Sequence, residues 1–243
     1  MAVCGNIIII KEDYEFLNPC TRSHSVTTRL RAMQEKIAER AKLWYKKDNK
    51  SVKEVFPMPE MLDIVDENGL PTGQAVPRTV AHAEGLRHRT SHVWIVRKKN
   101  GAVQVLLQMR CAAKDSYPGC YDISSAGHIP AGAEFVGSAL RELKEELGVT
   151  AAPQDLHVCG LRRFRFESVF HGKPFKDNQV SKVFCLWLDK EAEDFTVQRS
   201  EIDYVKWFDL DEAIRAVDEG TIPNCIFPEE LGMVREFVAG AKG

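Results

Sequence analysis

The chain lacks several features that would place it in a specialised class of protein. No apolar run approaches the roughly 20 residues of a membrane-spanning helix. The most apolar stretch of the N-terminal arm, residues 7–10, is four isoleucines, too short even for the core of a signal peptide. Neither sign of charge dominates, because 33 Lys and Arg residues are balanced by 35 Asp and Glu residues. This balance gives no reason to expect nucleic acid or a membrane as a partner, and we expect a cytoplasmic protein.

Paired cysteines are also missing. The seven cysteines are odd in number and scattered, and no two of them are separated by two residues. This pattern argues against both a zinc knuckle and a disulfide framework. What the chain has instead is the composition of a globular domain, with 44% hydrophobic and 28% charged residues. A packed core is therefore expected, and extensive disorder is not.

Residues 25–47 carry the spacing of an amphipathic helix. Its apolar positions recur at three- and four-residue steps: Leu30, Met33, Ile37, Ala41 and Trp44. Basic residues surround this stripe, but Glu35 and Glu39 dilute the positive face. That dilution favours packing on the domain or on a second copy of the chain over contact with a membrane or nucleic acid. We predict an N-terminal helical extension over residues 1–55 and a main domain over residues 56–243.

From residue 61 onward the periodicity becomes that of strands. Short apolar or alternating runs predict strands at 61–65, 92–97, 103–110, 156–170, 182–188 and 203–208. Residues 98–101, Lys-Lys-Asn-Gly, suit a hairpin turn. Asp209 is placed to cap a helix over 210–219, and a closing helix is predicted over 228–239. This order predicts an α/β fold in which a mixed β-sheet lies between helices.

The most informative stretch is Arg-Glu-Leu-Lys-Glu-Glu-Leu-Gly at residues 141–148. Glu142, Glu145 and Glu146, which we call the acidic ridge, are spaced so that one helix face carries all three. The leucines of the same stretch fall on another face, suited to burial. Like charges at this spacing destabilise an isolated helix, so the acidic ridge calls for a cation. Oxygen donors without a nearby cysteine favour Mg²⁺ or Mn²⁺, and the alternative is a solvated acidic face.

The residues around the acidic ridge resemble a known motif. A Gly/Pro loop, Gly127-His-Ile-Pro-Ala-Gly132, precedes the helix. Residues 127–149 resemble the Nudix box, and eight positions agree with it: Gly127, Arg141, Glu142, Leu143, Glu145, Glu146, Gly148 and Val149. One position departs, because Ala133 stands where the box has Glu, and Glu134 follows one residue later.

This resemblance implies both a fold and a site. The fold is a Nudix-type α/β/α sandwich with a mixed sheet. The acidic ridge and the backbone of Gly127 are expected to hold Mg²⁺ or Mn²⁺. The ridge is also expected to be catalytic, with Glu145 and Glu146 as alternatives for the base that activates water. Arg141 is expected to turn away from the metal and pair with a carboxylate such as Glu134, which fixes the loop.

The predicted reaction is metal-dependent hydrolysis of a diphosphate bond, in a nucleoside diphosphate linked to another moiety or in a similar organic diphosphate. A divalent metal neutralises the phosphate oxygens that would otherwise repel a nucleophile. Basic side chains must meet the phosphates of such a small-molecule substrate. The best candidates are Arg110 at a strand end and Arg163 and Arg165 on one strand face.

Segments flanking the box resemble the Nudix subgroup related to isopentenyl-diphosphate isomerase. That reaction needs a Cys and a Glu where this chain has Ala126 and Gln179, and neither replacement can exchange a proton. His88 and His128 fall at metal positions of the isomerases, with His82 one residue out of step, and we interpret all three as relict or structural. The sequence favours hydrolysis. It leaves open an isomerase-like activity, a catalytically silent binding module, and a homodimer of the kind common in the family.

Overall fold

The computed structural model describes residues 59–114, 116–170 and 172–241. The predicted amphipathic helix over 25–47, and the extension over 1–55 that contains it, lie outside these residues. In chain order the described elements are β1 (Met61–Val65), β2 (Pro71–Pro77), α2 (Arg78–Glu84), β3 (His88–Lys99), β4 (Ala102–Arg110), β5 (Tyr121–Asp122), β6 (Ser125–His128), α3 (Phe135–Leu147), β7 (Leu156–Phe170), β8 (Lys173–Trp187), β9 (Ile202–Asp209), α4 (Leu210–Asp218) and α5 (Pro228–Gly240).

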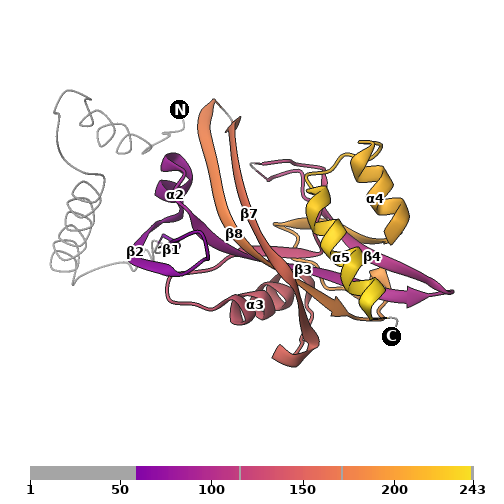
Figure 1. Cartoon of the computed structure of the whole chain (residues 1–243). Helices are drawn as coiled ribbons and strands as arrows, with labels where there is room; N and C mark the ends of the chain where they lie inside the picture. Colours follow the sequence, from indigo (N-terminus) through magenta and orange to yellow (C-terminus); the bar gives the residue numbers. More distant parts are fainter. Residues whose placement is uncertain (1–58, 115, 171, 242–243) are drawn as a thin grey trace, which may run out of the picture. The chain divides into compact units, whose positions relative to one another are not determined.

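A mixed sheet forms the centre of the domain, as predicted. Strand β3 pairs in parallel with β8 and antiparallel with β4 and β6. Strand β7 continues the sheet beyond β8, and β5 and β9 pair with β4. Strands β1 and β2 form a separate two-stranded sheet. Figure 1 shows β7 and β8 running side by side as a long ribbon.

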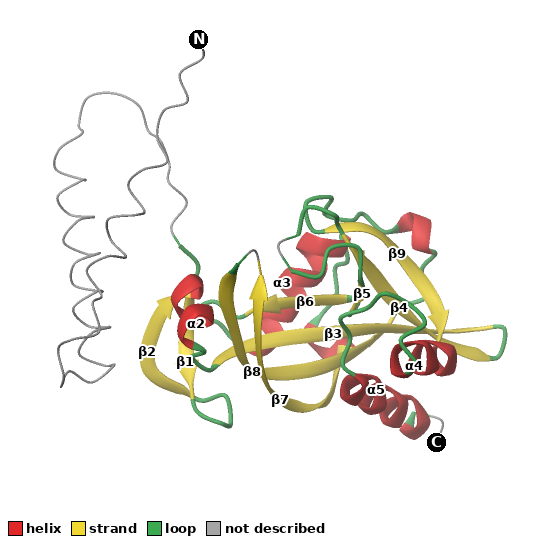
Figure 2. Cartoon of the chain, turned by 90° about the horizontal axis from the view of Figure 1, so that it is seen from above, coloured by secondary structure: helices red, strands yellow, loops and turns green. Residues whose placement is uncertain are grey.

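Helices cover both faces of this sheet, because the side chains of β3 alternate between two apolar cores. Trp94 and Val96 pack with residues of α4 and α5 in one core. Val93 and Ile95 pack with residues of α3 in the other. Figure 2 shows α3 on one side of the strands and α4 and α5 on the other. The predicted arrangement of a mixed sheet between helices is confirmed.

The hairpin between β3 and β4 turns where the sequence predicts. Lys99 pairs with Ala102, so Asn100 and Gly101 form a two-residue loop. Their φ angles are 53° and 81°, which is the left-handed pair of a type I′ turn. Asn and Gly are the residues that tolerate this backbone best.

Several elements differ from the prediction. Strand β8 begins at Lys173 instead of residue 182, and β2, α2, β5 and β6 were not predicted. The first part of β8 is rich in polar residues and pairs with β7 in the ribbon, so it lacks the apolar run that marks a buried strand.

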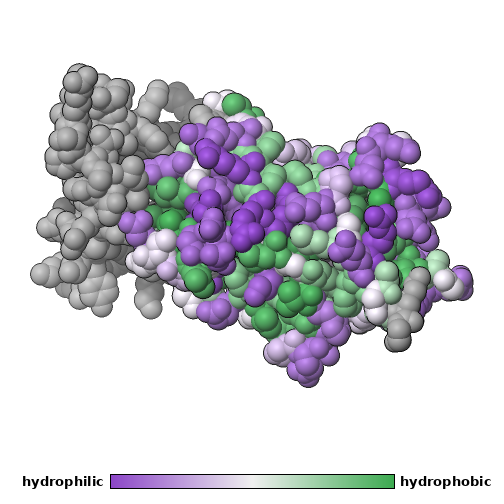
Figure 3. All heavy atoms as spheres, viewed as in Figure 1, coloured by the Kyte–Doolittle hydropathy of each residue, from purple (hydrophilic) through white to green (hydrophobic). Residues whose placement is uncertain are grey.

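On the face drawn in Figure 3, apolar residues form groups separated by polar ones. Each helix in the described part of the chain is too short or too polar to span a lipid bilayer.

One buried ionic cluster ties α5 to the sheet. The Glu230 carboxylate is 1% exposed and accepts hydrogen bonds from His92 Nδ1 at 2.8 Å, Trp94 Nε1 at 3.0 Å and Arg162 Nη1 at 3.2 Å. Burial acts to raise the pKa of Glu230, but His92 and Arg162 outweigh it and lower that pKa below its usual range. Fully paired charges of this kind are tolerated in a core because each polar atom has a partner.

Helix α4 begins at a cap that offers a test of the fold. The Asp209 side chain accepts from the backbone N–H groups of Asp211 at 3.0 Å and Glu212 at 3.2 Å. We expect Asp209→Ala to lower the free energy of unfolding by about 1 kcal/mol, because these donors lose their partner. Chemical denaturation would measure it. Asp218→Ala, at the opposite end of the helix, should be neutral or slightly stabilising, and an equal loss in both variants would contradict the capping role.

Candidate active site

Helix α3 carries the acidic ridge and is fixed by its apolar face. Leu143 and Leu147 are fully buried, as the spacing predicts. The helix ends at Gly148, which has the predicted left-handed cap conformation, φ 66°. A Cβ there would also lie 2.9 Å from Cβ of Thr196, so glycine is required for space as well as for backbone conformation.

Strand β6 meets the acidic ridge at Glu146. The Ser125 hydroxyl donates to Glu146 Oε2 at 2.7 Å, and the backbone N–H of Ala126 lies 3.3 Å from the same oxygen. Glu146 is 8% exposed. Burial raises the pKa of its carboxyl to about 8, and the negative charge of the neighbouring Glu142 adds to this rise. The hydrogen bond from Ser125 acts in the opposite direction and lowers the pKa. No ion pair involves Glu146 within the described residues, and a nearly buried carboxyl in such surroundings favours protonation or a bound cation.

Gly127 allows the closest approach between this strand and the acidic ridge. A Cβ at position 127 would lie 2.2 Å from Oε1 of Glu142 and 2.3 Å from its Cδ. The carboxyl of Glu142 thus occupies the space of a missing side chain. Burial raises the pKa of Glu142, and Arg141 partly offsets the rise. The glycine that the sequence marks is explained by this contact.

Arg141 takes a place that the sequence did not predict. Its guanidinium donates to Glu142 Oε1 at 2.6 Å and to Glu145 Oε2 at 2.9 Å. Glu134 lies exposed at the start of α3, and no ion pair joins it to Arg141 in the described part of the chain. Arg141 therefore turns toward two members of the acidic ridge and neutralises them, instead of turning away to pair with Glu134.

A second group of chemically active side chains lies on the other side of β6. Within the described ranges, His82, His88 and His128 form the one set of three His, Cys or acidic residues whose ligand atoms all lie within 4.8 Å of one another. Asp177 Oδ1 lies 3.6 Å from His88 Nε2 and 3.7 Å from His82 Nδ1. Burial lowers the pKa of His82 to about 4 and also lowers those of His88 and His128.

Comparison with known proteins identifies the family. A family model described as the NUDIX domain matches residues 86–225, more than half of the chain. The chain belongs to the Nudix hydrolase family. It is a pyrophosphohydrolase, in a family that typically uses divalent metal ions and small-molecule diphosphate substrates.

This Nudix hydrolase matches its relatives over different shares of their length. Nudix hydrolase 3 of Arabidopsis thaliana is 39% identical over 155 residues, which are 63% of this chain and 20% of that protein. An uncharacterized Nudix hydrolase of Clostridium acetobutylicum is 34% identical over 159 residues, or 65% of this chain and 74% of that protein. The crystal structure of DR0079 from Deinococcus radiodurans has a TM-score of 0.52 at 18% identity, over 72% of this chain and 98% of that one. The last likeness shows the fold alone.

The loop before the Nudix helix is held by a pair that the sequence analysis missed. Arg89 is 4% exposed and donates to Asp63 Oδ2 at 3.0 Å and to the carbonyl of Ala133 at 2.9 Å. Asp63 also accepts from the backbone N–H of Gly132 at 2.8 Å. Position 133 therefore contributes a backbone carbonyl, for which alanine suffices. No local pattern marks this pair, because Asp63 and Arg89 are distant in sequence from the loop.

The three arginines predicted to bind substrate phosphates lie in different surroundings. Arg110 donates hydrogen bonds to Asp122 at 2.9 Å and to the carbonyl of Ser116. Burial acts to lower the pKa of Arg110, but the carboxylate of Asp122 outweighs it and raises that pKa. Asp122 also contributes to the raised pKa of Glu146, so the Arg110–Asp122 pair lies within electrostatic range of the acidic ridge. Arg163 donates to the carbonyl of Glu67 at 2.6 Å.

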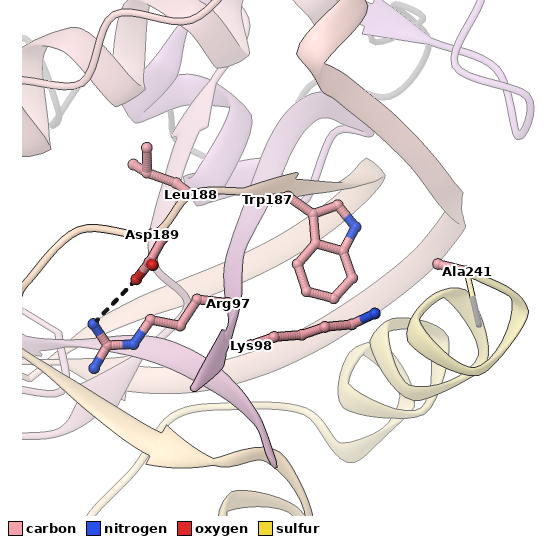
Figure 4. A pocket seen from close by; sticks show the side chains of 6 residues that line it. All are labelled: Arg97, Lys98, Trp187, Leu188, Asp189 and Ala241. Carbon is pink, nitrogen blue, oxygen red and sulfur yellow. Dashed lines mark ion pairs between the residues drawn. The ribbon is translucent and has the colours of Figure 1, made fainter. Parts of the chain in front are cut away.

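The Arg165 side chain is 73% exposed and pairs with Glu167 at 3.1 Å on the β7–β8 ribbon. A hollow of about 420 Å³ lies elsewhere, at the end of β3, between Lys98 and Trp187 (Figure 4). Arg97, which lines this hollow, lies on β3 six residues after Ser91, and Ser91 pairs with Gly127. Six residues span about 20 Å along a strand. This hollow is separate from the acidic ridge.

Proposed function

We propose that this Nudix hydrolase cleaves a diphosphate bond in a nucleoside diphosphate linked to another moiety, or in a similar organic diphosphate, with Mg²⁺ or Mn²⁺ at the acidic ridge. The observation that carries the proposal is the placement of Glu142 and Glu146 against β6. One carboxyl fills the space beside Gly127 and the other is buried against Ser125. Burial raises the pKa of both, and a divalent cation is the partner that would favour their charged forms.

The donor set fits such an ion. Carboxylate oxygens are the ligands that Mg²⁺ and Mn²⁺ prefer, and Arg141 already shows that two of the three carboxylates accept a cationic neighbour. Glu142, Glu145, Glu146 and the carbonyl of Gly127 would hold the metal. When bound, it neutralises the diphosphate and lowers the pKa of a coordinated water.

The remaining roles follow from exposure. Glu146 is buried and its Oε2 is engaged by Ser125, so we assign it to positioning. The Glu145 side chain is 52% exposed and can meet an attacking water, so we assign it the proton-accepting role. Arg141 holds the Glu142 and Glu145 side chains in place. Arg110, whose partner Asp122 acts on the pKa of Glu146, is the best candidate among the three arginines for a phosphate contact.

Two positions support hydrolysis over an isomerase-like activity. Ala126 lies on β6 directly opposite His92 of β3 and offers no thiol. Gln179 pairs in register with His88, and its amide donates to Asp177 Oδ2 at 2.8 Å. Both lie beside the histidines, where a proton donor and acceptor would be required, and neither can supply one.

A substrate panel tests the proposal. With Mg²⁺, the full chain should release a monophosphate from at least one member of a panel of nucleotide sugars, ADP-ribose, dinucleotides and prenyl diphosphates, scored by product mass. Glu145→Gln should lower kcat by about 10²-fold or more, because the base is lost. Glu212→Gln, at an exposed glutamate of α4, should leave it unchanged.

Other outcomes of the same assay would overturn the proposal. Conversion of isopentenyl diphosphate to dimethylallyl diphosphate, without hydrolysis, would indicate an isomerase. Binding of substrates with no turnover would indicate a silent binding module. Full activity of Glu145→Gln would refute the assigned base.

A further inference from the structure

Strands β7 and β8, which run side by side in Figure 1, each carry one cysteine at the same level of the sheet. Cys185 of β8 pairs in register with His157 of β7, and Cys159 follows His157 by two residues. Side chains alternate between the faces of a strand, so Cys159 shares the face of His157 and Cys185. The packing agrees, because Cys185 belongs to the core that contains residues of α4 and α5, and Cys159 packs against the same core.

A β-bulge lies at Cys159. Val158 pairs with Phe184 and Gly160 pairs with Val183, so Cys159 is an extra residue on β7 with no paired residue of its own on β8. Diagonal neighbours on regular antiparallel strands are about 7–8 Å apart. An extra residue bends its strand and redirects its side chain. We infer that the bulge brings Cys159 closer to Cys185 than a regular ladder would.

The sulfur atoms of these two cysteines are in direct contact. The Cys185 thiol and the Cys185 backbone N–H both donate hydrogen bonds to the sulfur of Cys159. The Cys159 thiol itself lies 3.7 Å from the carbonyl of His157. Two sulfurs that already touch across neighbouring strands are placed to form a disulfide, whose S–S bond is about 2.05 Å long.

The two thiols differ in exposure and in pKa. Cys185 is fully buried, and its hydrogen bond to Cys159, together with burial, raises its pKa. Cys159 is half-buried, and the hydrogen bonds from Cys185 lower its pKa. Among the described thiols whose pKa departs from the usual value, only Cys159 has a lowered one. An accessible thiol of lowered pKa beside a second cysteine is the arrangement that reacts with peroxides.

We propose that Cys159 is a site of oxidation by hydrogen peroxide and that Cys185 resolves it by forming a disulfide between β7 and β8. The Cys159 thiolate attacks one peroxide oxygen, the O–O bond breaks, and hydroxide leaves and takes up the proton that the thiol released. This step gives a sulfenic acid. The Cys185 sulfur then attacks the Cys159 sulfur, the S–O bond breaks, and the oxygen leaves as water with the Cys185 proton. In sum, the two thiols lose two electrons and one peroxide becomes two waters.

This oxidation site is separate from the proposed hydrolysis, and its test needs no turnover. Cys159 and Cys185 lie on the face of the sheet that packs with α4 and α5, whereas the acidic ridge belongs to α3 on the other face. The disulfide closes a loop between residues 159 and 185, which limits the freedom of the unfolded chain. The thermal midpoint of the oxidised chain should therefore rise by about 5–10 °C.

Peptide mapping of the full chain is the first test. Trypsin places the two cysteines in separate peptides, residues 145–162 and 183–190, each with a single cysteine. After the native chain is treated with a small excess of hydrogen peroxide and its remaining thiols are blocked, these peptides should be joined. Their mass should lie two hydrogens below the sum of the two, and a thiol reductant should separate them.

The same oxidation in concentrated guanidinium chloride is the control, because unfolding lets the seven cysteines pair without preference. The joined peptides should be far more abundant after oxidation of the native chain. Their absence from the native chain, or an equal abundance in the unfolded chain, would overturn the proposal.

Variants test the two roles. Cys185→Ala should let oxidation of Cys159 proceed to the sulfinic or sulfonic acid, because no second thiol stops it. Cys159→Ser should leave the cysteine of peptide 183–190 as a free thiol, because Cys185 is buried. Cys225→Ala, at a half-buried cysteine whose pKa is raised by burial, should form the disulfide as the unaltered chain does. If Cys185→Ala fails to fold, Cys159→Ser and the peptide map decide. Equal oxidation of Cys185 with and without Cys159 would refute the role of Cys159 as the reactive thiol.

Discussion

Replacing Glu146 with Gln should remove pyrophosphohydrolase activity and, in the same molecule, stabilise the metal-free protein at pH 8–9. Loss of one ligand of the acidic ridge should lower kcat by about 10³-fold. The stability gain follows from the pKa of Glu146, which burial raises from 4.5 to about 8. A carboxyl with a raised pKa contributes stability below its unfolded value, and this contribution is lost as the pH rises through the folded value.

In Glu146→Gln the amide is uncharged at every pH, as the protonated carboxyl is. This variant therefore does not lose stability as the pH rises. Each unit of pKa shift corresponds to about 1.4 kcal/mol, so the gain above pH 8 should be about 2–4 kcal/mol. Thermal unfolding in a chelator, at pH 5 and pH 9, would measure it. The gain should be small at pH 5 and large at pH 9.

Glu145→Gln is the matched control for this prediction. Its carboxylate belongs to the same ridge, but the side chain is 52% exposed and paired with Arg141. It should lose activity without the gain in stability at high pH. If Glu146→Gln and Glu145→Gln show the same pH dependence of unfolding, burial of Glu146 is not the cause.

The second large effect is expected at Gly127. Its backbone does not need a left-handed conformation, so alanine is acceptable to the chain itself. The added Cβ would nevertheless overlap the carboxyl of Glu142, at 2.2 Å from Oε1 and 2.3 Å from Cδ. The Glu142 side chain must then swing away, which also breaks its contact with Arg141. Gly127→Ala should lower activity by about 10²-fold or more and raise the Mg²⁺ concentration needed for half-maximal rate.

Gly137→Ala supplies a control from the same helix. A Cβ at Gly137 meets no atom within 4 Å, and the residue lies inside α3. Alanine there should stabilise the protein by about 0.5–1 kcal/mol and leave the rate unchanged. Magnesium titrations of activity, with thermal unfolding of both variants, would compare the two. Unaltered magnesium dependence in Gly127→Ala would refute the role given to this close approach.

The features that the sequence predicts well are local. The spacing of the acidic ridge and its leucines predicts the helix and the two faces that α3 presents. Asn100-Gly101 predicts the hairpin and Asp209 predicts the helix cap, because each of these residues favours one backbone conformation or one hydrogen bond on its own. Those predictions need no knowledge of what packs against them.

The features that the sequence does not reveal depend on pairing between distant segments. The Asp63–Arg89 pair replaces the expected Glu134 support, although neither residue belongs to the box. His82 and Asp177 meet because α2 and β8 lie side by side. The sequence does not indicate that these histidines converge, since a single histidine in a sequence carries no sign of its neighbours.

Strand β6 has four residues, and its two sides serve different neighbours. Ser125 and Gly127 face the acidic ridge, whereas His128 meets His82. Inserting or deleting one residue here would exchange the sides and disable both groups in a single event. During evolution, this segment should therefore change by substitution and keep its length, while the loops beyond it are free to grow or shrink.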